Sequence, residues 1–283
     1  MRGWGGVLVL MAVLGAAVLH ATWNAMAHGV PDRLAGFALL GLASGVAGLI
    51  AIIVTGPPPS GTWPYIIASI VLHLVYYGGL LASYQLGQFS QMYPLARGTS
   101  PWVVAVVSIV VLHQSLAPAE LAGVLLISAG LIGLVFIGRS AGRAQTAALL
   151  AAFGTGLSIA AYTVVDGLAV HKMPVATYMG WVFMIQGFIV PIVALCWRGP
   201  AVFKQPQSAV LSGLGGGVVS MAAYGLVLWA QTRGTLAAIA ALRETSIIFG
   251  AIIGAIFFGE RFGPRRAIAA AVVVGGIVLI SVS

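Results

Sequence analysis

Long apolar runs, separated by short segments rich in proline, glycine or charge, fill the sequence from end to end. A helix needs about 20 mostly apolar residues to cross the hydrocarbon core of a bilayer. Ten runs meet or approach that length, so we predict an all-α integral membrane protein with ten transmembrane helices. The runs are Gly5–Ala27, Leu34–Thr55, Trp63–Leu86, Met92–His113, Ala119–Gly138, Ala144–Val170, Val175–Trp197, Ser208–Gln231, Leu236–Gly259 and Arg266–Ser283.

The second half of the chain repeats the first. The segment Tyr93–Pro118 aligns without gaps on Ile239–Pro264, which places Arg97 on Arg243 at an offset of 146 residues. Each copy holds five predicted helices, an odd number, so the second copy would enter the membrane from the opposite side. We therefore predict two inverted five-helix repeats, residues 1–140 and 141–283. Inverted repeats are typical of secondary transporters, whose substrate site lies near the midplane between the halves.

Composition supports the membrane assignment and excludes several other classes. Only 6% of the residues are charged and 60% are hydrophobic, with a mean hydropathy of +1.08, so the chain cannot cover a surface that faces water. The net charge of +8 does not indicate nucleic-acid binding, because the cations lie singly or in small groups at the ends of apolar runs. The single Cys196 allows no internal disulfide and matches no metal-ligand spacing. We expect no cofactor and no metal.

The loop charges predict an orientation in the cell (inner) membrane. Three loop cations lie on one side of the predicted topology and eight on the other. The first group is Arg2, Lys172 and Arg233, and the second is Arg33, Arg139, Arg143, Arg198, Lys204, Arg261, Arg265 and Arg266. The side richer in cations is normally cytoplasmic, so the count weakly favours both termini outside the cytoplasm.

Three short motifs suggest a family. The segments LHATWNA in the first predicted helix, YPLARGTSP in the fourth and FFGERFGP after the ninth resemble the EamA-like branch of the drug/metabolite transporter superfamily. The resemblance implies a basket of ten helices, with the third, fourth, eighth and ninth lining a central cavity. It also implies export or exchange of amino acids or other small metabolites, and more commonly cytoplasmic termini. The chain departs from the pattern at Gln114-Ser115, where the matching Gly259-Glu260 keeps the Gly-Glu pair.

Four charged residues within the predicted spans are candidates for function. They are Arg97, Arg243, Glu244 and Asp166. Charges inside a span are costly and usually face the protein interior or an aqueous cavity. An arginine guanidinium suits a carboxylate or phosphate, so Arg97 and Arg243 could hold the anionic part of a substrate. Alternatively, Arg97 pairs with Glu244, or Arg243 with Asp166, as structural links between the repeats.

The two acids differ in position. Glu244 has Gly98 as its counterpart in the first half, and this asymmetry makes it a candidate for proton coupling or for binding an amine. The alternative is that Glu244 only neutralises Arg97. Asp166 lies about one turn from the end of its predicted helix, which favours an interfacial ion-pair role over coupling.

Polar and aromatic side chains complete the candidate site. The remaining candidates are His20, Asn24, His73, Tyr77, Trp102 and Tyr224. His20 and Asn24 share one helical face, as do His73 and Tyr77. Together these side chains could wall a cavity that holds an amphiphilic metabolite. The alternative interpretation is helix packing, and for Asn24 a hydrogen bond to a neighbouring helix.

These observations predict a secondary active transporter, an exporter or exchanger of a small zwitterionic or anionic metabolite such as an amino acid. It would work by alternating access around a cavity between the repeats, with protons as the candidate coupling ion, as a monomer or homodimer surrounded by lipid. A cation or multidrug-type amine exporter that uses Glu244 and the aromatic side chains is the alternative. We do not expect an enzyme, because no metalloprotease or nucleophile-elbow motif occurs.

Overall fold

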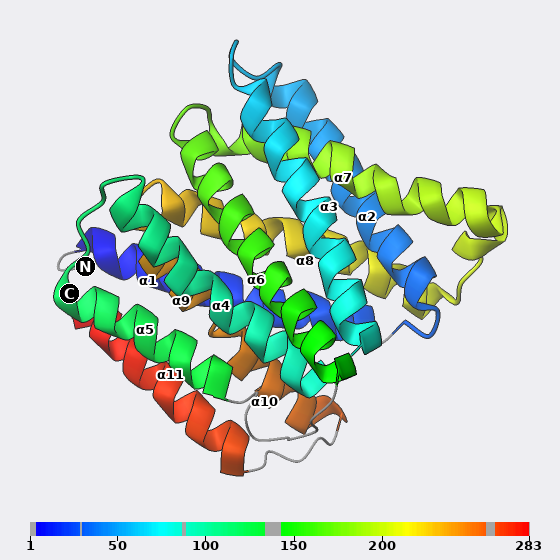
Figure 1. The fold of residues 1–283 in the computed structure, drawn as a ribbon. Helices are drawn as coiled ribbons and strands as arrows, with labels where there is room; N and C mark the ends of the chain where they lie inside the picture. The colour runs from blue at the N-terminus through cyan, green and yellow to red at the C-terminus, as the bar shows by residue number, and fades with distance from the viewer. Residues whose placement is uncertain (1–3, 29, 87–88, 134–142, 259–263, 283) are drawn as a thin grey trace.

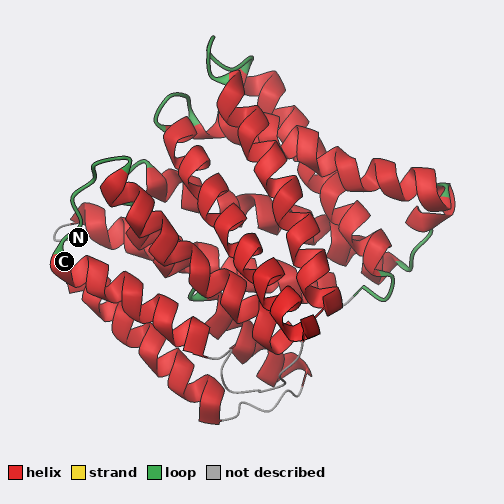
Figure 2. Ribbon diagram, viewed as in Figure 1, coloured by secondary structure: helices red, strands yellow, loops and turns green. Residues whose placement is uncertain are grey.

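The computed structural model describes residues 4–28, 30–86, 89–133, 143–258 and 264–282, and these form a bundle of helices without strands (Figures 1 and 2). The helices of the first half are α1 (Trp4–His28), α2 (Arg33–Thr55), α3 (Trp63–Leu86), α4 (Phe89–Val110) and α5 (Pro118–Gly133). Those of the second half are α6 (Arg143–Val170), α7 (Val175–Arg198), α8 (Gln207–Gln231), α9 (Leu236–Arg243), α10 (Ser246–Phe258) and α11 (Pro264–Val282). A short 3₁₀ helix, η2 (Pro200–Phe203), connects α7 to α8.

The all-helical membrane fold predicted from the apolar runs is confirmed for the described residues. Five helices, namely α1, α2, α6, α7 and α8, are long and apolar enough to cross a membrane. The chain is therefore a multi-pass membrane protein, whereas the full count of ten spans stays a prediction. The fourth run ends earlier than predicted, since α4 stops at Val110 and His113 has a φ of +51°. The predicted end of the fifth helix and the Gly259-Glu260 pair lie outside the described residues.

The run Leu236–Gly259 was predicted as one helix and is instead divided into α9 and α10. The backbone amides of Glu244 and Thr245 donate to carbonyl oxygens three residues back, at 3.0 and 3.1 Å. Hydrogen bonds of this spacing tighten the backbone into a 3₁₀ turn. The Thr245 hydroxyl also donates to the carbonyl oxygen of Leu242 at 2.7 Å. The break therefore arises from local hydrogen bonding without proline or glycine.

The equivalent stretch of the first half behaves differently. Pro94 and Pro101 flank Arg97, and a proline inside a helix removes one backbone donor. The helix α4 nevertheless continues through both prolines. The two copies of the aligned segment thus have different backbones, and only the copy that carries Glu244 is interrupted.

The outer surface of the bundle is apolar. Large hydrophobic side chains are strongly exposed on several helices, for example Ile53, Val54 and Ile256 at 75%, 79% and 70%. A surface patch of this kind on a water-soluble protein would be an aggregation or docking site. On a membrane protein it is the surface that faces lipid, and the buried charged residues occupy the interior instead.

Glycines let several helices approach closely. On α2, a Cβ at Gly48 would lie 2.5 Å from the backbone nitrogen of Met184 on α7. A Cβ at Gly187 of α7 would lie 2.5 Å from the backbone nitrogen of Gly45. The contact between α5 and α11 is similar, because a Cβ at Gly123 would lie 2.6 Å from a carbonyl oxygen of α11. Small residues at such interfaces replace side-chain packing by backbone contact.

The helix contacts have a pairwise pattern. Helix α3 packs on α6. The counterpart of α3 in the second repeat is α8, which packs on α1. Likewise α4 packs on α6, and α9 and α10 pack on α1. Helices α2 and α5 pack on their own counterparts, α7 and α11. The start of α1 and the end of α11 lie at the same end of the bundle (Figure 1).

The contact between α2 and α8 and the equivalent contact between α3 and α7 differ in extent. Helix α2 packs extensively on α8, and a Cβ at Gly217 would lie 2.3 Å from the carbonyl oxygen of Leu40. The equivalent contact of α3 with α7 is much smaller. There, Trp63 and Trp181 pack edge to face with ring centroids 4.8 Å apart. We call these contacts the α2–α8 seam and the α3–α7 seam.

Candidate functional site

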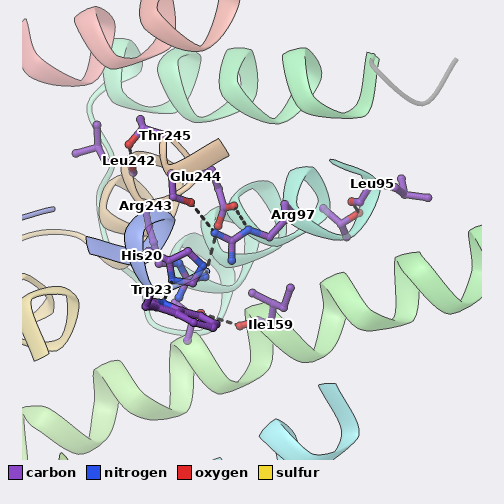
Figure 3. Close-up of polar contacts among 12 residues, drawn as sticks. His20, Trp23, Leu95, Arg97, Ile159, Leu242, Arg243, Glu244 and Thr245 are labelled. Carbon is purple, nitrogen blue, oxygen red and sulfur yellow. Dashed lines mark hydrogen bonds and ion pairs between the residues drawn. The ribbon is translucent and has the colours of Figure 1, made fainter. Parts of the chain in front are cut away.

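A buried charge cluster lies where α4 meets the break between α9 and α10. Arg97 on α4 is 4% exposed, Arg243 at the end of α9 is 5% exposed, and Glu244 in the break is fully buried. Figure 3 shows these three side chains together with His20 and Trp23 of α1. Residues 97 and 243 are equivalent in the repeat, so two equivalent arginines enter one cluster.

Arg97 is firmly held by its neighbours. Its Nε lies 2.6 Å from Oε2 of Glu244, and its Nη2 donates to the Ser246 hydroxyl at 3.0 Å. Ser246 is the first residue of α10, so Arg97 connects α4 to both sides of the helix break. The guanidinium carbon also lies 5.8 Å from the ring centroid of Tyr93. Of the two structural pairings predicted from the sequence, the Arg97–Glu244 pair is present.

Arg243 is held less closely than Arg97, although Nε of Arg97 also has only its ion pair and no hydrogen bond. Nη2 of Arg243 lies 3.5 Å from Oε1 of Glu244, a loose ion pair. Within the described chain, neither its Nε nor its Nη2 has a hydrogen-bond partner. Its guanidinium carbon lies 5.9 Å from the ring centroid of Tyr162. Two guanidinium groups thus share one carboxylate, and Arg243 keeps donors that can bind another anion.

Helix α1 brings a histidine to the cluster. The indole N–H of Trp23 donates to Nδ1 of His20 at 3.2 Å, and the two rings pack edge to face at 5.1 Å. Nδ1 is therefore the acceptor, so a neutral His20 carries its proton on Nε2. His20 is half-buried and lies beside the arginines in Figure 3.

A second buried polar group surrounds Asp166 of α6, which is 1% exposed. The Tyr178 hydroxyl of α7 donates to its Oδ1, and the Tyr224 hydroxyl of α8 donates to its Oδ2. Within the described residues, Asp166 forms no ion pair, so the predicted Arg243–Asp166 pair is wrong. Asp166 does lie one turn before the end of α6, as expected, but its side chain is inside the bundle and not at its surface.

Stacked rings connect the two polar groups. His73 of α3 stacks on Tyr162 of α6, with centroids 4.0 Å apart and planes at 20°. His73 also packs edge to face on Tyr224 at 6.0 Å. Its Nδ1 lies 2.8 Å from the carbonyl oxygen of Ser69, which can only accept, so Nδ1 carries the proton. A continuous row of side chains therefore runs from Arg243 to Asp166.

Three candidates from the sequence do not join these groups. The Asn24 amide is exposed and donates to the carbonyl oxygen of His20 in its own helix at 2.7 Å, so the described residues give it no partner on another helix. Tyr77 is 53% exposed, and its ring packs at a tilt on the ring of Tyr76 with centroids 5.1 Å apart. Trp102 is half-buried and lies about 140° around α4 from Arg97, because five residues separate them.

Sequence reasoning overlooked three polar residues. Ser246 binds Arg97, and Tyr178 binds Asp166. Glu120, in the first turn of α5, is buried and accepts a hydrogen bond from the Thr235 hydroxyl just before α9. The alignment of residues 93–118 on 239–264 contains Ser246, so this one could have been found from the sequence. No group of three potential metal ligands occurs in the part of the chain that the structure describes.

Comparison with known proteins gives two positive findings. Residues 146–282 match the model of the EamA-like transporter family. A crystal structure, described only as that of a protein, aligns with 99% of this chain and 99% of its own at a TM-score of 0.75. Its 20% sequence identity supports a shared fold and nothing further. Among curated proteins, none matches the chain.

Proposed function

We propose a specific activity for this protein. Residues 146–282 match the model of the EamA-like transporter family, and this match indicates a membrane transporter of the drug/metabolite type. The protein is a secondary active transporter, an exporter or exchanger of a small zwitterionic or anionic metabolite such as an amino acid. The substrate binds in the interior of the bundle, at the charge cluster of Arg97, Arg243 and Glu244.

The observation that carries this proposal is the incomplete binding of Arg243. A buried guanidinium without a full set of acceptors is costly, and a ligand carboxylate or phosphate would supply them. The cluster contains one more positive than negative side chain, so an anionic group also balances its charge. Arg97 is already bound to Glu244 and Ser246, and its role is to hold the site together.

The broken helix adds to the argument for this position. In many transporters, interrupted helices place backbone ends at the substrate near the membrane midplane. Here α9 ends at Arg243 and α10 begins at Ser246, and both residues contribute side chains to the cluster. The last turn of α9 carries a cation that complements the negative end of the helix dipole.

Alternating access between two inverted repeats, residues 1–140 and 141–283, is the mechanism we propose. Two observations support it. The helix contacts made by one repeat are also made by the equivalent helices of the other repeat, and the α2–α8 seam is more extensive than the equivalent α3–α7 seam. A close α2–α8 seam and a looser α3–α7 seam are what one state of such a transporter would have. In the other state, α3 and α7 would pack closely and α2 and α8 would pack loosely.

Glu244 is poorly placed for the alternative, an amine exporter. Its carboxylate lies between two guanidinium groups, at 2.6 and 3.5 Å, and these already neutralise its charge. An amine would have to compete with both arginines. We therefore retain the anionic or zwitterionic substrate.

A ligand screen tests the proposal. The unfolding temperature of the purified protein is measured with L-amino acids, dicarboxylates, sugar phosphates and quaternary ammonium compounds. A ligand that binds only the native state raises this temperature. We expect a carboxylate or phosphate compound to do so, Arg243→Gln to abolish the shift, and the exposed control Arg198→Gln to keep it. A shift produced only by quaternary ammonium compounds and preserved in Arg243→Gln would contradict the proposal.

A further inference from the structure

Asp166 is a buried acid that the substrate site does not use. It lies within α6, is 1% exposed, and has no cation within ion-pair distance among the described residues. Ionisable residues within membrane spans are rare and usually serve transport or proton transfer. Its position between α6, α7 and α8 places it at the contact of three helices.

The partners of Asp166 allow it to change its charge without losing them. Both its oxygens accept hydrogen bonds from phenol hydroxyls, those of Tyr178 and Tyr224. A phenol hydroxyl can donate or accept. When a proton adds to one carboxylate oxygen, the new O–H donates to the facing tyrosine oxygen, whose own hydrogen turns away. The carboxyl group therefore keeps both partners in either protonation state.

Glu244 has partners of the opposite kind. The guanidinium groups of Arg97 and Arg243 only donate, and they carry full positive charge. A proton on Glu244 would leave two buried cations without a counter-ion. The two acids that were candidates for coupling thus differ in what their neighbours permit.

We propose that Asp166 is the proton-binding site of this transporter, and that its protonation, not that of Glu244, is coupled to transport. The proposal rests on the proposed function, since coupling has meaning only for a transporter. The ligand is a proton, which enters and leaves through the side chain of Asp166.

The surroundings of Asp166 define what its proton would affect. Besides Tyr178 and Tyr224, which bind Asp166 directly, the helices packed around α6 carry several buried titratable or charged groups. These are His73 and Tyr76 of α3, Arg97 of α4, Tyr162 of α6 itself, and Arg243 with Glu244 at the α9–α10 break. Tyr162 touches both His73 and the guanidinium of Arg243. The row of rings, formed by Tyr162, His73 and Tyr224, therefore separates Asp166 from Arg243 of the substrate site by three aromatic side chains.

The position of Asp166 also suits a coupling role. Tyr178 belongs to an apolar cluster that joins the first turns of α3 to α7, with Ile66, Ile70 and Val182. This cluster lies at the α3–α7 seam, the looser of the two seams. A charge change at Asp166 acts through Tyr178 on that seam. The loops at this end carry the fewer cations, so the proton would arrive from the outside.

Infrared difference spectroscopy of the reconstituted protein tests the site without a substrate. The carbonyl stretch of a protonated carboxyl group is recorded while the pH is lowered. We expect a band in the wild-type protein and in Glu244→Gln that is absent from Asp166→Asn. The variant Asp32→Asn changes a half-buried acid in a loop and is the matched control, which keeps the band. Persistence of the band in Asp166→Asn, or its loss in Glu244→Gln, would overturn the proposal.

Two further variants guard against a folding defect in Asp166→Asn. Tyr178→Phe and Tyr224→Phe each remove one hydroxyl but leave the carboxyl group, so we expect the band to shift in frequency and to remain. An unshifted band in both variants would show that another carboxyl group is titrating and would equally overturn the proposal.

The transport measurement separates this inference from the proposed function. With a substrate found in the ligand screen, Asp166→Asn should lose net transport driven by a pH gradient but keep substrate exchange without a gradient. Gradient-driven transport at the wild-type rate would refute the role of Asp166 in coupling. If none of the screened compounds is carried, the proposed substrate class fails, whereas the infrared band still decides whether Asp166 binds the proton.

Discussion

Arg97 and Arg243 occupy equivalent positions of the repeat and yet differ in their bonds. Arg97 pairs closely with Glu244 and binds Ser246, whereas Arg243 has only a loose contact with the same carboxylate. The asymmetry comes from one residue, because Glu244 replaces the glycine of the first half. A Cβ at Gly98 would lie 2.9 Å from side-chain atoms of α5, so this position cannot hold a glutamate without moving α5. The acid is therefore possible in one half only.

The Arg97–Glu244 pair should be needed for stability. Removing one partner of a buried pair costs about 3–5 kcal/mol, because the other charge stays buried and uncompensated. We expect Arg97→Met and Glu244→Gln to lower the free energy of unfolding by amounts of that order. The double variant should lose less than the sum of the two.

The control for this cycle is the exposed pair of Arg198 and Asp32, whose charged atoms lie 2.7 Å apart. Exposed pairs contribute about 0–1 kcal/mol, so Arg198→Met should change stability little. Unfolding measured in mixed micelles gives all four values. Strictly additive losses for Arg97 and Glu244 would show that the two side chains do not interact in the membrane.

The sequence predicts the positions of some buried charged side chains but not the partners of others. The repeat alignment predicts that Arg97 and Arg243, as equivalent residues, both lie near the interface of the halves. It could not pair Asp166 with Tyr178 and Tyr224. These three residues lie on α6, α7 and α8, and their meeting depends on how the helices rotate and cross.

Among the secondary-structure elements, hydropathy predicted the helices well and the helix break not at all. A break is expected at proline or glycine, yet α4 continues through its two prolines. The interruption lies in the other copy, at Glu244-Thr245. A buried ion pair and the Thr245 hydroxyl stabilise it, and neither contact is visible in a pattern of apolar residues.

The packing of α2 on α7 depends on glycines in both helices and can be tested by adding one methyl group. Gly187→Ala would place its Cβ 2.5 Å from the backbone of Gly45, where neither helix can move aside. Overpacking of this kind costs about 1–3 kcal/mol. We expect a lower unfolding temperature for this variant.

The matched control is Gly154→Ala on α6, because no atom lies within 4 Å of the added Cβ. Alanine also favours the helical backbone over glycine, so this variant should be as stable as the wild type or slightly more so. An equal loss of stability in both variants would contradict a close α2–α7 contact.

Over the whole molecule, the loop charges predict which end faces the cytoplasm. The end with the α7–α8 connection carries more cations than the end with the α6–α7 connection. The first should therefore be cytoplasmic and the second external, with both termini outside. Nothing in the helix packing depends on this choice, so it needs its own measurement.

Cysteine labelling provides that measurement, because Cys196 is the only native cysteine. In a Cys196→Ser background, Lys172→Cys and Lys204→Cys place one exposed thiol in each connection. We expect a membrane-impermeant maleimide to label position 172 in intact cells and position 204 only after permeabilisation. The reverse result would invert the topology and bring the termini into the cytoplasm.

In the proposed transporter, the buried and incompletely bound Arg243 holds the anionic group of the transported substrate. Counterflow in proteoliposomes tests this role most directly, with the compound that stabilises the purified protein as the labelled substrate. We expect saturable counterflow by the wild type and by Arg198→Gln, and none by Arg243→Gln. Wild-type counterflow by Arg243→Gln, or flux that never saturates, would contradict this role.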